Sequence, residues 1–269
     1  MQLATTLNPR WLPARICGRV GRGAFRFLGS AGQMALFFAT ALRRIVHRPF
    51  RARELVAQIE FVGARSTGVV ALSAVFTGLV LALQGYNVLV RFGSENLVGS
   101  LVTLSLTREL APVLAALMVT ARAGSAMAAV IGNMAVTEQL DALKSLAIDP
   151  ISYLAVPRLL GTVIALPLLT AGFSVAGIGA AYLFSVLVLG LDGLAFMSNV
   201  RSSVEWSDVS IGLWKALIFG ALIAGIATFR GFHTSGGARG VGRATSRTVV
   251  DSAVLILCGD YVVTALLSR

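Results

Sequence analysis

The feature that most constrains this chain is a series of apolar runs, each long enough to cross a bilayer. We predict spans at about residues 66–90, 98–121, 209–229 and 248–267, and further spanning sequence within 151–190. A transmembrane helix needs about 20 predominantly apolar residues. Because the bilayer offers no water to an open backbone, such runs must be helical. The chain is therefore predicted to be an all-α integral membrane protein with about five transmembrane helices.

Composition agrees with a bilayer environment. Hydrophobic residues make up 56% of the 269 residues, charged residues only 13%, and the mean hydropathy is +0.81. Soluble domains usually carry about 25% charged residues. The net charge of +11 would suggest nucleic acid on a soluble protein. Here the basic residues flank the apolar runs and no nucleic-acid motif is present, so we predict no nucleic-acid partner.

The forty-residue apolar stretch 151–190 decides the span count. It is too long for one plain span, yet it contains no polar turn that would divide it into two. We favour one long span, bent near Pro157 or Pro167 and preceded by an amphipathic lead-in. The alternative of two spans would reverse the sides of all downstream segments. Residues 191–208 are predicted to form a short outer helix or loop.

The distribution of Lys and Arg indicates the orientation. With five spans, segments 1–65, 122–158 and 230–247 hold 11, 3 and 4 basic residues on one side. The other side holds four, Arg91, Arg201, Lys215 and Arg269, and Arg108 lies within a span. Basic residues accumulate on the cytoplasmic side. We therefore predict a cytoplasmic N-terminus and a C-terminus on the outer side, with 230–247 as a flexible, basic inner loop.

The basic segment 1–65 is expected to lie in the cytoplasm and at the membrane surface, and 66–269 to form the transmembrane domain. Residues 34–46, MALFFATALRRIV, are too short to span and end in basic residues. We predict an amphipathic helix in the headgroup layer. The alternative is a span over 24–42, which would bury Arg26 and Gln33.

Arg108 and Glu109 stand out because they lie inside the second span. At 1.5 Å per residue, Arg108 is about 15 Å along it. An ionised side chain at that depth is costly and should face a bundle interior or a cavity. Two interpretations follow: a cavity wall that meets a polar or anionic substrate group, or a structural ion pair between helices. Pro112, close behind, is expected to open the helix locally.

Residues 136–148, VTEQLDALKSLAI, form a predicted short amphipathic helix between two spans. Asp149-Pro150 then starts the next helix, with Asp149 as N-cap. The short helix could dock a soluble partner or rest on the membrane surface.

Enzyme chemistry has no support in the sequence. No G-x-x-x-x-G-K-[ST] motif occurs, so the chain has no P-loop of its own. The two cysteines, Cys17 and Cys258, are far apart, and the two histidines do not cluster with them. We predict no catalytic residue, no disulfide, no metal site and no bound cofactor.

The run LSLTRELAPVLAALMVTARAGSAMAAVIGNMAVTEQLDALKSLAIDPISYLAVPRLLG, residues 104–161, strongly resembles the MlaE-type permease family of ABC transporters. LALQGYNVL (81–89) and RATSRTVVDSAVLILCGDYVVTALL (243–267) are similar to the same family. The resemblance covers roughly residues 60–269. It implies a permease homodimer in the bacterial inner membrane, with a periplasmic C-terminus.

The implied partners are a cytoplasmic ABC ATPase that carries ATP and Mg, a STAS-domain protein bound to that ATPase, and a ring of MCE-domain subunits on the outer face. The implied cargo is phospholipid, moved between the inner and outer membranes. The competing hypotheses are a stand-alone secondary transporter or channel that uses Arg108 and Glu109 for ion coupling, and a membrane scaffold.

The resemblance also implies residue roles. Arg108 and Glu109 would line a lipid cavity at the dimer centre, with Tyr86 and Phe92 beside it. Segment 136–148 is similar to the family's coupling helix, which contacts the ATPase. The residues assigned to that contact are Glu138, Gln139, Leu140, Asp141 and Leu143.

Overall fold

The computed structural model describes residues 29, 32–44 and 52–267. Every regular element in these residues is a helix, and five helical stretches are long and apolar enough to cross a membrane. They are Ala52–Phe92, Glu95–Val136, Ile151–Leu187, Trp206–Phe232 and Gly237–Leu266. The prediction of an all-α membrane protein with about five spans is confirmed.

The first span consists of two helices that meet at Gly63. They are α2 (Ala52–Val62) and α3 (Ala64–Leu89), and a 3-10 turn, Val90–Phe92, follows. A Cβ on Gly63 would lie only 2.8 Å from the carbonyl oxygen of Ile59, so a larger residue would force the junction to shift. The helical stretch that contains position 66 begins at Ala52, and the predicted division of the chain at residue 65 remains a prediction.

The second span is one helical stretch interrupted by two π-helical turns. Its parts are a 3-10 turn at Glu95–Leu97, α4 (Val98–Ser105), a π turn at Leu106–Leu110, α5 (Ala111–Val119), a π turn at Thr120–Gly124 and α6 (Ser125–Val136).

The helical stretch continues to Val136, beyond the predicted end of the span near residue 121. Arg122, which suggested a boundary, has hydrogen-bond acceptors inside the bundle. It donates hydrogen bonds of 2.9 Å to the carbonyl oxygen of Phe61 and to the hydroxyl of Ser66.

The stretch 151–190 holds a single span, as favoured from the sequence. A π turn, Ile151–Ala155, leads into α8 (Val156–Leu187). Pro157 has no N–H to donate to the preceding turn, which explains why the irregular turn lies there. Pro167 lies within the continuous α-helix.

The remaining helices are α7 (Gln139–Ser145), α9 (Gly193–Ser203), α10 (Trp206–Phe232) and α11 (Gly237–Leu267). The prediction of a flexible loop at 230–247 was wrong, because α10 and α11 leave only residues 233–236 between them. Glycine-rich composition suggested a loop, but Gly240 serves a close contact instead: a Cβ there would lie 2.0 Å from the carbonyl oxygen of Ser235.

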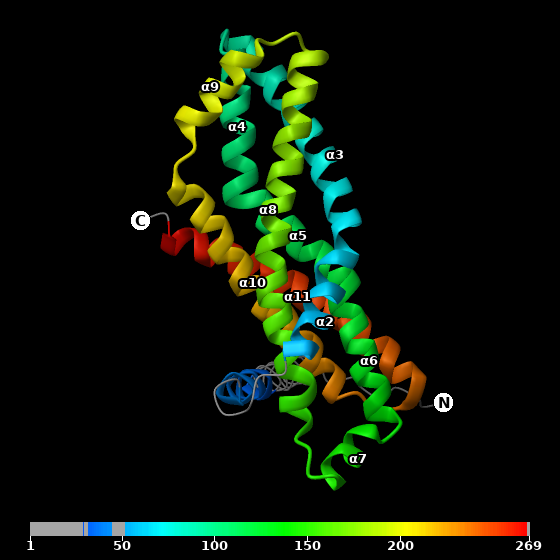
Figure 1. Ribbon diagram of the computed structural model, residues 1–269. Coiled ribbons are helices and arrows are strands. Elements are labelled where there is room, and N and C mark those ends of the chain that lie inside the picture. Colours follow the sequence, from blue (N-terminus) through cyan, green and yellow to red (C-terminus); the bar gives the residue numbers. More distant parts are fainter. Residues whose placement is uncertain (1–28, 30–31, 45–51, 268–269) are drawn as a thin grey trace, which may run out of the picture.

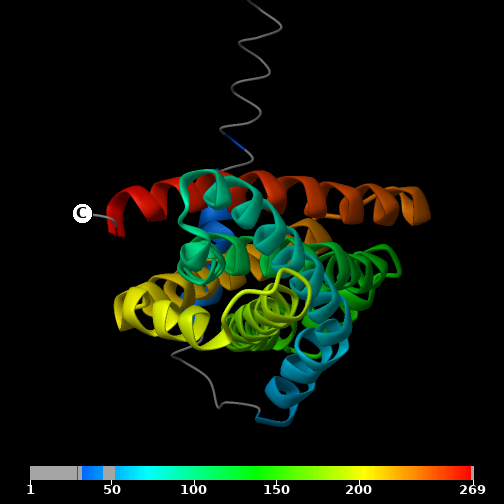
Figure 2. The ribbon, with the colours of Figure 1, turned by 90° about the horizontal axis from the view of Figure 1, so that it is seen from above.

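The spans pack closely and turn apolar side chains outward. Figure 1 shows α7 and α9 at opposite ends of the bundle, and α11 runs along one edge of it in Figure 2. Gly78 and Gly177 let α3 and α8 touch, since a Cβ on Gly78 would lie 2.1 Å from the Gly177 carbonyl oxygen. Large apolar side chains are exposed at four-residue intervals on the outer face of α3 (Leu72, Phe76 and Val80). Such a stripe suits lipid rather than water.

Residues 32–44 form a helix that overlaps most of the predicted interfacial segment 34–46. Residues 45 and 46 lie outside the described part of the chain. The helix packs on two spans, because Ala41 is fully buried with Leu159 of α8 and Ala224 of α10. Arg44 forms an ion pair with Asp149. The helix is therefore attached to the bundle as well as suited to a membrane surface.

Candidate functional site: buried charges and an exposed short helix

The π turn Leu106–Leu110 places Arg108 and Glu109 in the middle of the second span. Pro112 cannot donate an N–H to the carbonyl of Arg108, and the Ala111 N–H bonds instead to the carbonyl of Leu106, five residues back. The prediction that Pro112 opens the helix locally is confirmed. Gly212 of α10 lies against this turn, since a Cβ there would come within 2.2 Å of the Thr107 carbonyl oxygen.

Arg108 is paired with the first turn of α10. One of its terminal nitrogens (Nη1) lies 3.4 Å from Oδ1 of Asp208, whose side chain is 9% exposed. Asp208 also accepts a hydrogen bond of 3.0 Å from the backbone N–H of Glu205 and so closes a capping box. The arginine therefore meets a carboxylate that the fold already holds in place.

Glu109 belongs to a three-helix charge cluster that we call the buried triad: Glu109, Lys215 of α10 and Asp260 of α11. The Lys215 side chain is fully buried and its ammonium donates a hydrogen bond to Glu109. The Lys215 nitrogen lies 2.9 Å from Oδ1 of Asp260, an ion pair without hydrogen-bond geometry. Thr264 donates a further hydrogen bond of 3.3 Å to Glu109. Two carboxylates thus share one ammonium.

The buried triad corrects one sequence-based assignment. Lys215 was counted among the outer basic residues, but the structure buries its side chain completely within α10. Asp260 was not among the residues assigned a role from the sequence. The sequence did contain a signal for this cluster, because Lys215 and Asp260 each lie inside an apolar run. Ionised side chains in a bilayer need partners of opposite charge.

The structure does not join the four predicted cavity residues to one another. Tyr86 is partly buried against the hydrophobic core, and Phe92 is 76% exposed at the end of the first span. Within the described part of the chain, no hydrogen bond or ion pair connects either of them to Arg108 or Glu109. In a single copy of the chain, Arg108 and Glu109 both form ion pairs between helices, which agrees with the structural interpretation of these charges. Their role in a lipid cavity stays a prediction.

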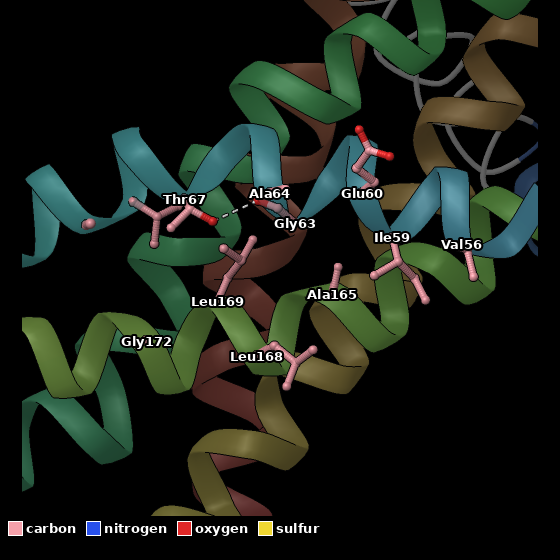
Figure 3. Close-up of a pocket in the computed structure, with 12 residues that line it drawn as sticks. Val56, Ile59, Glu60, Gly63, Ala64, Thr67, Ala165, Leu168, Leu169 and Gly172 are labelled. Atoms are coloured by element: carbon pink, nitrogen blue, oxygen red, sulfur yellow. Dashed lines mark hydrogen bonds between the residues drawn. The ribbon is translucent and has the colours of Figure 1, made fainter.

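An apolar groove lies elsewhere, between the first span and α8. It has a volume of about 560 Å³ and centres on the α2–α3 junction, with Ile59, Gly63 and Thr67 on one wall and Leu168 and Leu169 on the other. Figure 3 shows Leu169 pointing toward the first span, while the Glu60 carboxylate points away from α8. None of the predicted cavity residues lines this groove.

At the α7 end of the bundle the short helix is shorter than the predicted 136–148. Glu138 and Ala147 adopt left-handed backbone angles, with φ of 60° and 57°, and so bound the helix Gln139–Ser145. Glu138, Gln139 and Asp141 are exposed, whereas Leu140 is buried and Leu143 half-buried. Two apolar residues thus hold α7 to the protein, and its polar face is open to a partner.

Asp149 starts the third span as predicted. Its carboxylate accepts a 3.0 Å hydrogen bond from the backbone N–H of Ser152 and another from the Ser152 hydroxyl. Partial burial opposes ionisation, but these bonds and the charge of Arg44 outweigh it and lower the pKa of Asp149 below its ordinary value. The connection between α7 and α8 is therefore fixed by a charged cap.

These features define a multi-span α-helical membrane protein with charges paired inside the bundle and an exposed helix between two spans. The family model described as Permease MlaE matches residues 55–266. The chain is 42% identical over 254 residues to a probable ABC transporter permease protein of Rickettsia typhi, covering 94% of this chain and 98% of the relative.

It is 41% identical over 244 residues to the intermembrane phospholipid transport system permease protein MlaE of Haemophilus influenzae, covering 90% and 92%. It is also 35% identical to the chloroplast protein trigalactosyldiacylglycerol 1 of Arabidopsis thaliana, covering 87% of this chain and 65% of that protein. The chain belongs to the MlaE permease family of ABC transporters, as its central sequence predicted.

Proposed function

We propose that this chain is the membrane-spanning permease subunit of an ATP-driven phospholipid transporter that acts between the inner and outer membranes of a bacterium. Two findings support the cargo: membership of the MlaE family and 41% identity to a relative named for intermembrane phospholipid transport. The proposal places the chain in the inner membrane, with the α7 end in the cytoplasm and the α9 end in the periplasm.

The energy source is proposed to be a partner. The sequence contains no P-loop, so ATP and Mg would be bound by a cytoplasmic ABC ATPase. In this proposal the permease is a homodimer, a STAS-domain protein binds the ATPase, and a ring of MCE-domain subunits sits on the periplasmic face. This chain itself would hold no cofactor and catalyse no reaction.

The observation that carries the proposal is the exposed polar face of α7. Asp141 is 71% exposed in its side chain, and Leu140 anchors the helix from the opposite face. Because α7 follows directly on α6, a displacement of α7 by an ATPase would act on the same helical stretch, Glu95–Val136, that carries Arg108 and Glu109.

The lipid path is proposed to lie at the centre of the homodimer. Arg108 and Glu109 would face it with Tyr86 and Phe92 nearer the periplasmic end. Glu109 keeps 39% of its side chain exposed although it belongs to the buried triad, and Arg108 keeps 37%. Both charges therefore remain accessible to a second copy or to a lipid headgroup.

The experiment is co-purification of the chain with its ATPase in mild detergent. Asp141→Lys reverses an exposed charge and is expected to reduce ATPase recovery at least about tenfold, if this face forms the docking contact. Asn96→Lys, which adds a positive charge in the 3-10 turn near α9, is the matched control and should leave recovery unchanged. Normal ATPase recovery with Asp141→Lys would contradict the docking role of α7.

A further inference from the structure

A second polar site lies at the turn between α10 and α11, and it includes none of the residues of the buried triad, the predicted lipid cavity or α7. It is a pocket of about 180 Å³, and its polar lining consists of Arg230, His233, Thr234, Ser235, Arg243 and Arg247. Four of these six side chains carry basic groups. The question is what such a pocket holds.

Glycines shape this pocket. Gly236 and Gly237 have φ values of +86° and +67°, which favour glycine and reverse the chain within four residues. The missing side chain of Gly240 allows the first turn of α11 to lie against the Ser235 carbonyl. Arg243 then bends back over the turn, with its Nη2 3.4 Å from where a Cβ on Gly236 would be.

The pocket has an excess of positive charge. Arg230 is neutralised by Asp251, which accepts a 2.8 Å hydrogen bond from its Nε. Neither Arg243 nor Arg247 has an ion pair with any residue that the structure describes. The N-terminal end of the 31-residue helix α11 adds its own partial positive charge. Two guanidinium groups on successive turns, without an acid between them, favour an anionic ligand.

The position of the pocket indicates which anion. It lies between two spans, Trp206–Phe232 and Gly237–Leu266, and therefore at the depth where a spanning helix leaves the hydrocarbon. Figure 1 places this turn at the end of the bundle that carries α7. The anion that is abundant in that layer is the phosphate of a membrane lipid, and arginine matches phosphate with paired donors.

We propose that this pocket binds the phosphate of a lipid with net negative charge, held by Arg243 and Arg247. The proposal is independent of transport, because it concerns a lipid bound at the membrane surface and uses none of the cavity or docking residues. The chain offers a matched control: Arg239 lies on the same helix and is exposed, but it does not line the pocket.

The test is native mass spectrometry of the delipidated full chain in detergent, titrated separately with phosphatidylglycerol, phosphatidylcholine and inorganic phosphate. Wild type should bind phosphatidylglycerol about tenfold more tightly than phosphatidylcholine. The variant with Arg243→Gln and Arg247→Gln should lose this preference, because each charge-assisted bond contributes about 1.5–3 kcal/mol, or a factor of at least about ten. Arg239→Gln should keep it.

Three results would overturn the proposal. Equal losses in all arginine variants would mean a diffuse surface charge. Equal affinity of wild type for the two lipids would remove the selectivity for anionic lipid. Occupancy by inorganic phosphate at the concentrations that saturate phosphatidylglycerol would identify a free-anion site instead. Size-exclusion chromatography in detergent checks that the double variant is folded. If its elution volume differs from that of wild type, the single variants Arg243→Gln and Arg247→Gln are tested by the same criteria.

Discussion

Replacing Lys215 by methionine removes the only ammonium from the buried triad and keeps a side chain of similar length. Glu109 and Asp260 would then face each other without a cation between them. The Lys215 side chain is 0% exposed, so no water takes over its role at that position. The two carboxylates retain 39% and 22% exposure, which relieves part of the cost.

The size of the effect follows from these exposures. Removing one partner of a buried ion pair costs about 3–5 kcal/mol, because the remaining charge is left unpaired. Partial exposure of both carboxylates places this case near the lower end, at about 3 kcal/mol. For a chain of this size that corresponds to a fall of roughly 6–12 °C in apparent Tm.

Thermal unfolding of purified protein in detergent measures this loss. Lys144→Met is the control, because Lys144 pairs with Asp141 at the surface with side chains 65% and 71% exposed. Such a pair is worth about 0–1 kcal/mol, so the Tm of Lys144→Met should fall by no more than about 4 °C. A variant that combines Lys215→Met with Glu109→Gln and Asp260→Asn should regain most of the loss, since no charge remains unpaired. A Tm for Lys215→Met within about 2 °C of wild type, or no recovery in the triple variant, would refute the reasoning.

Two further predictions concern the half of the bundle that carries α7. Arg122→Met should lower the apparent Tm by removing the donor to the Phe61 carbonyl, a loss of about 1–3 kcal/mol, whereas the exposed Arg65→Met should change it little; equal shifts would count against this contact. Asp149→Asn should lower the Tm at neutral pH. Because the pKa of Asp149 is lowered in the folded state, its contribution is present above the unfolded pKa and fades as the pH falls through the folded pKa, so the Tm values of variant and wild type should converge in acid. A constant difference across the pH series would contradict the charged cap.

Apolar periodicity and length were enough to predict the overall architecture. The five spans, the single helix across 151–187 and the opening of the helix before Pro112 all follow from local sequence, since a bilayer imposes helix on any long apolar run. Arg108 and Glu109 were also recognised as unusual, because ionised groups within a span must find partners.

The partners themselves could not be predicted, because they lie far away in the sequence. Lys215 is 106 residues from Glu109, and Thr264 is 155. The acceptor for Arg122 is a carbonyl of the first span, and Gly240 of α11 lies in close contact with the Ser235 carbonyl of the preceding turn. Each of these contacts could be identified only from the three-dimensional packing of the helices.

The most direct test of the central claim is lipid transfer by the reconstituted complex. The chain is placed in proteoliposomes with its ATPase and MCE-domain partner, and a fluorescent phospholipid is followed from donor to acceptor. We expect transfer only with hydrolysable ATP and an active ATPase, and loss of transfer when the ATPase is omitted. Full transfer by this chain alone, without nucleotide, would contradict the account and favour a stand-alone transporter.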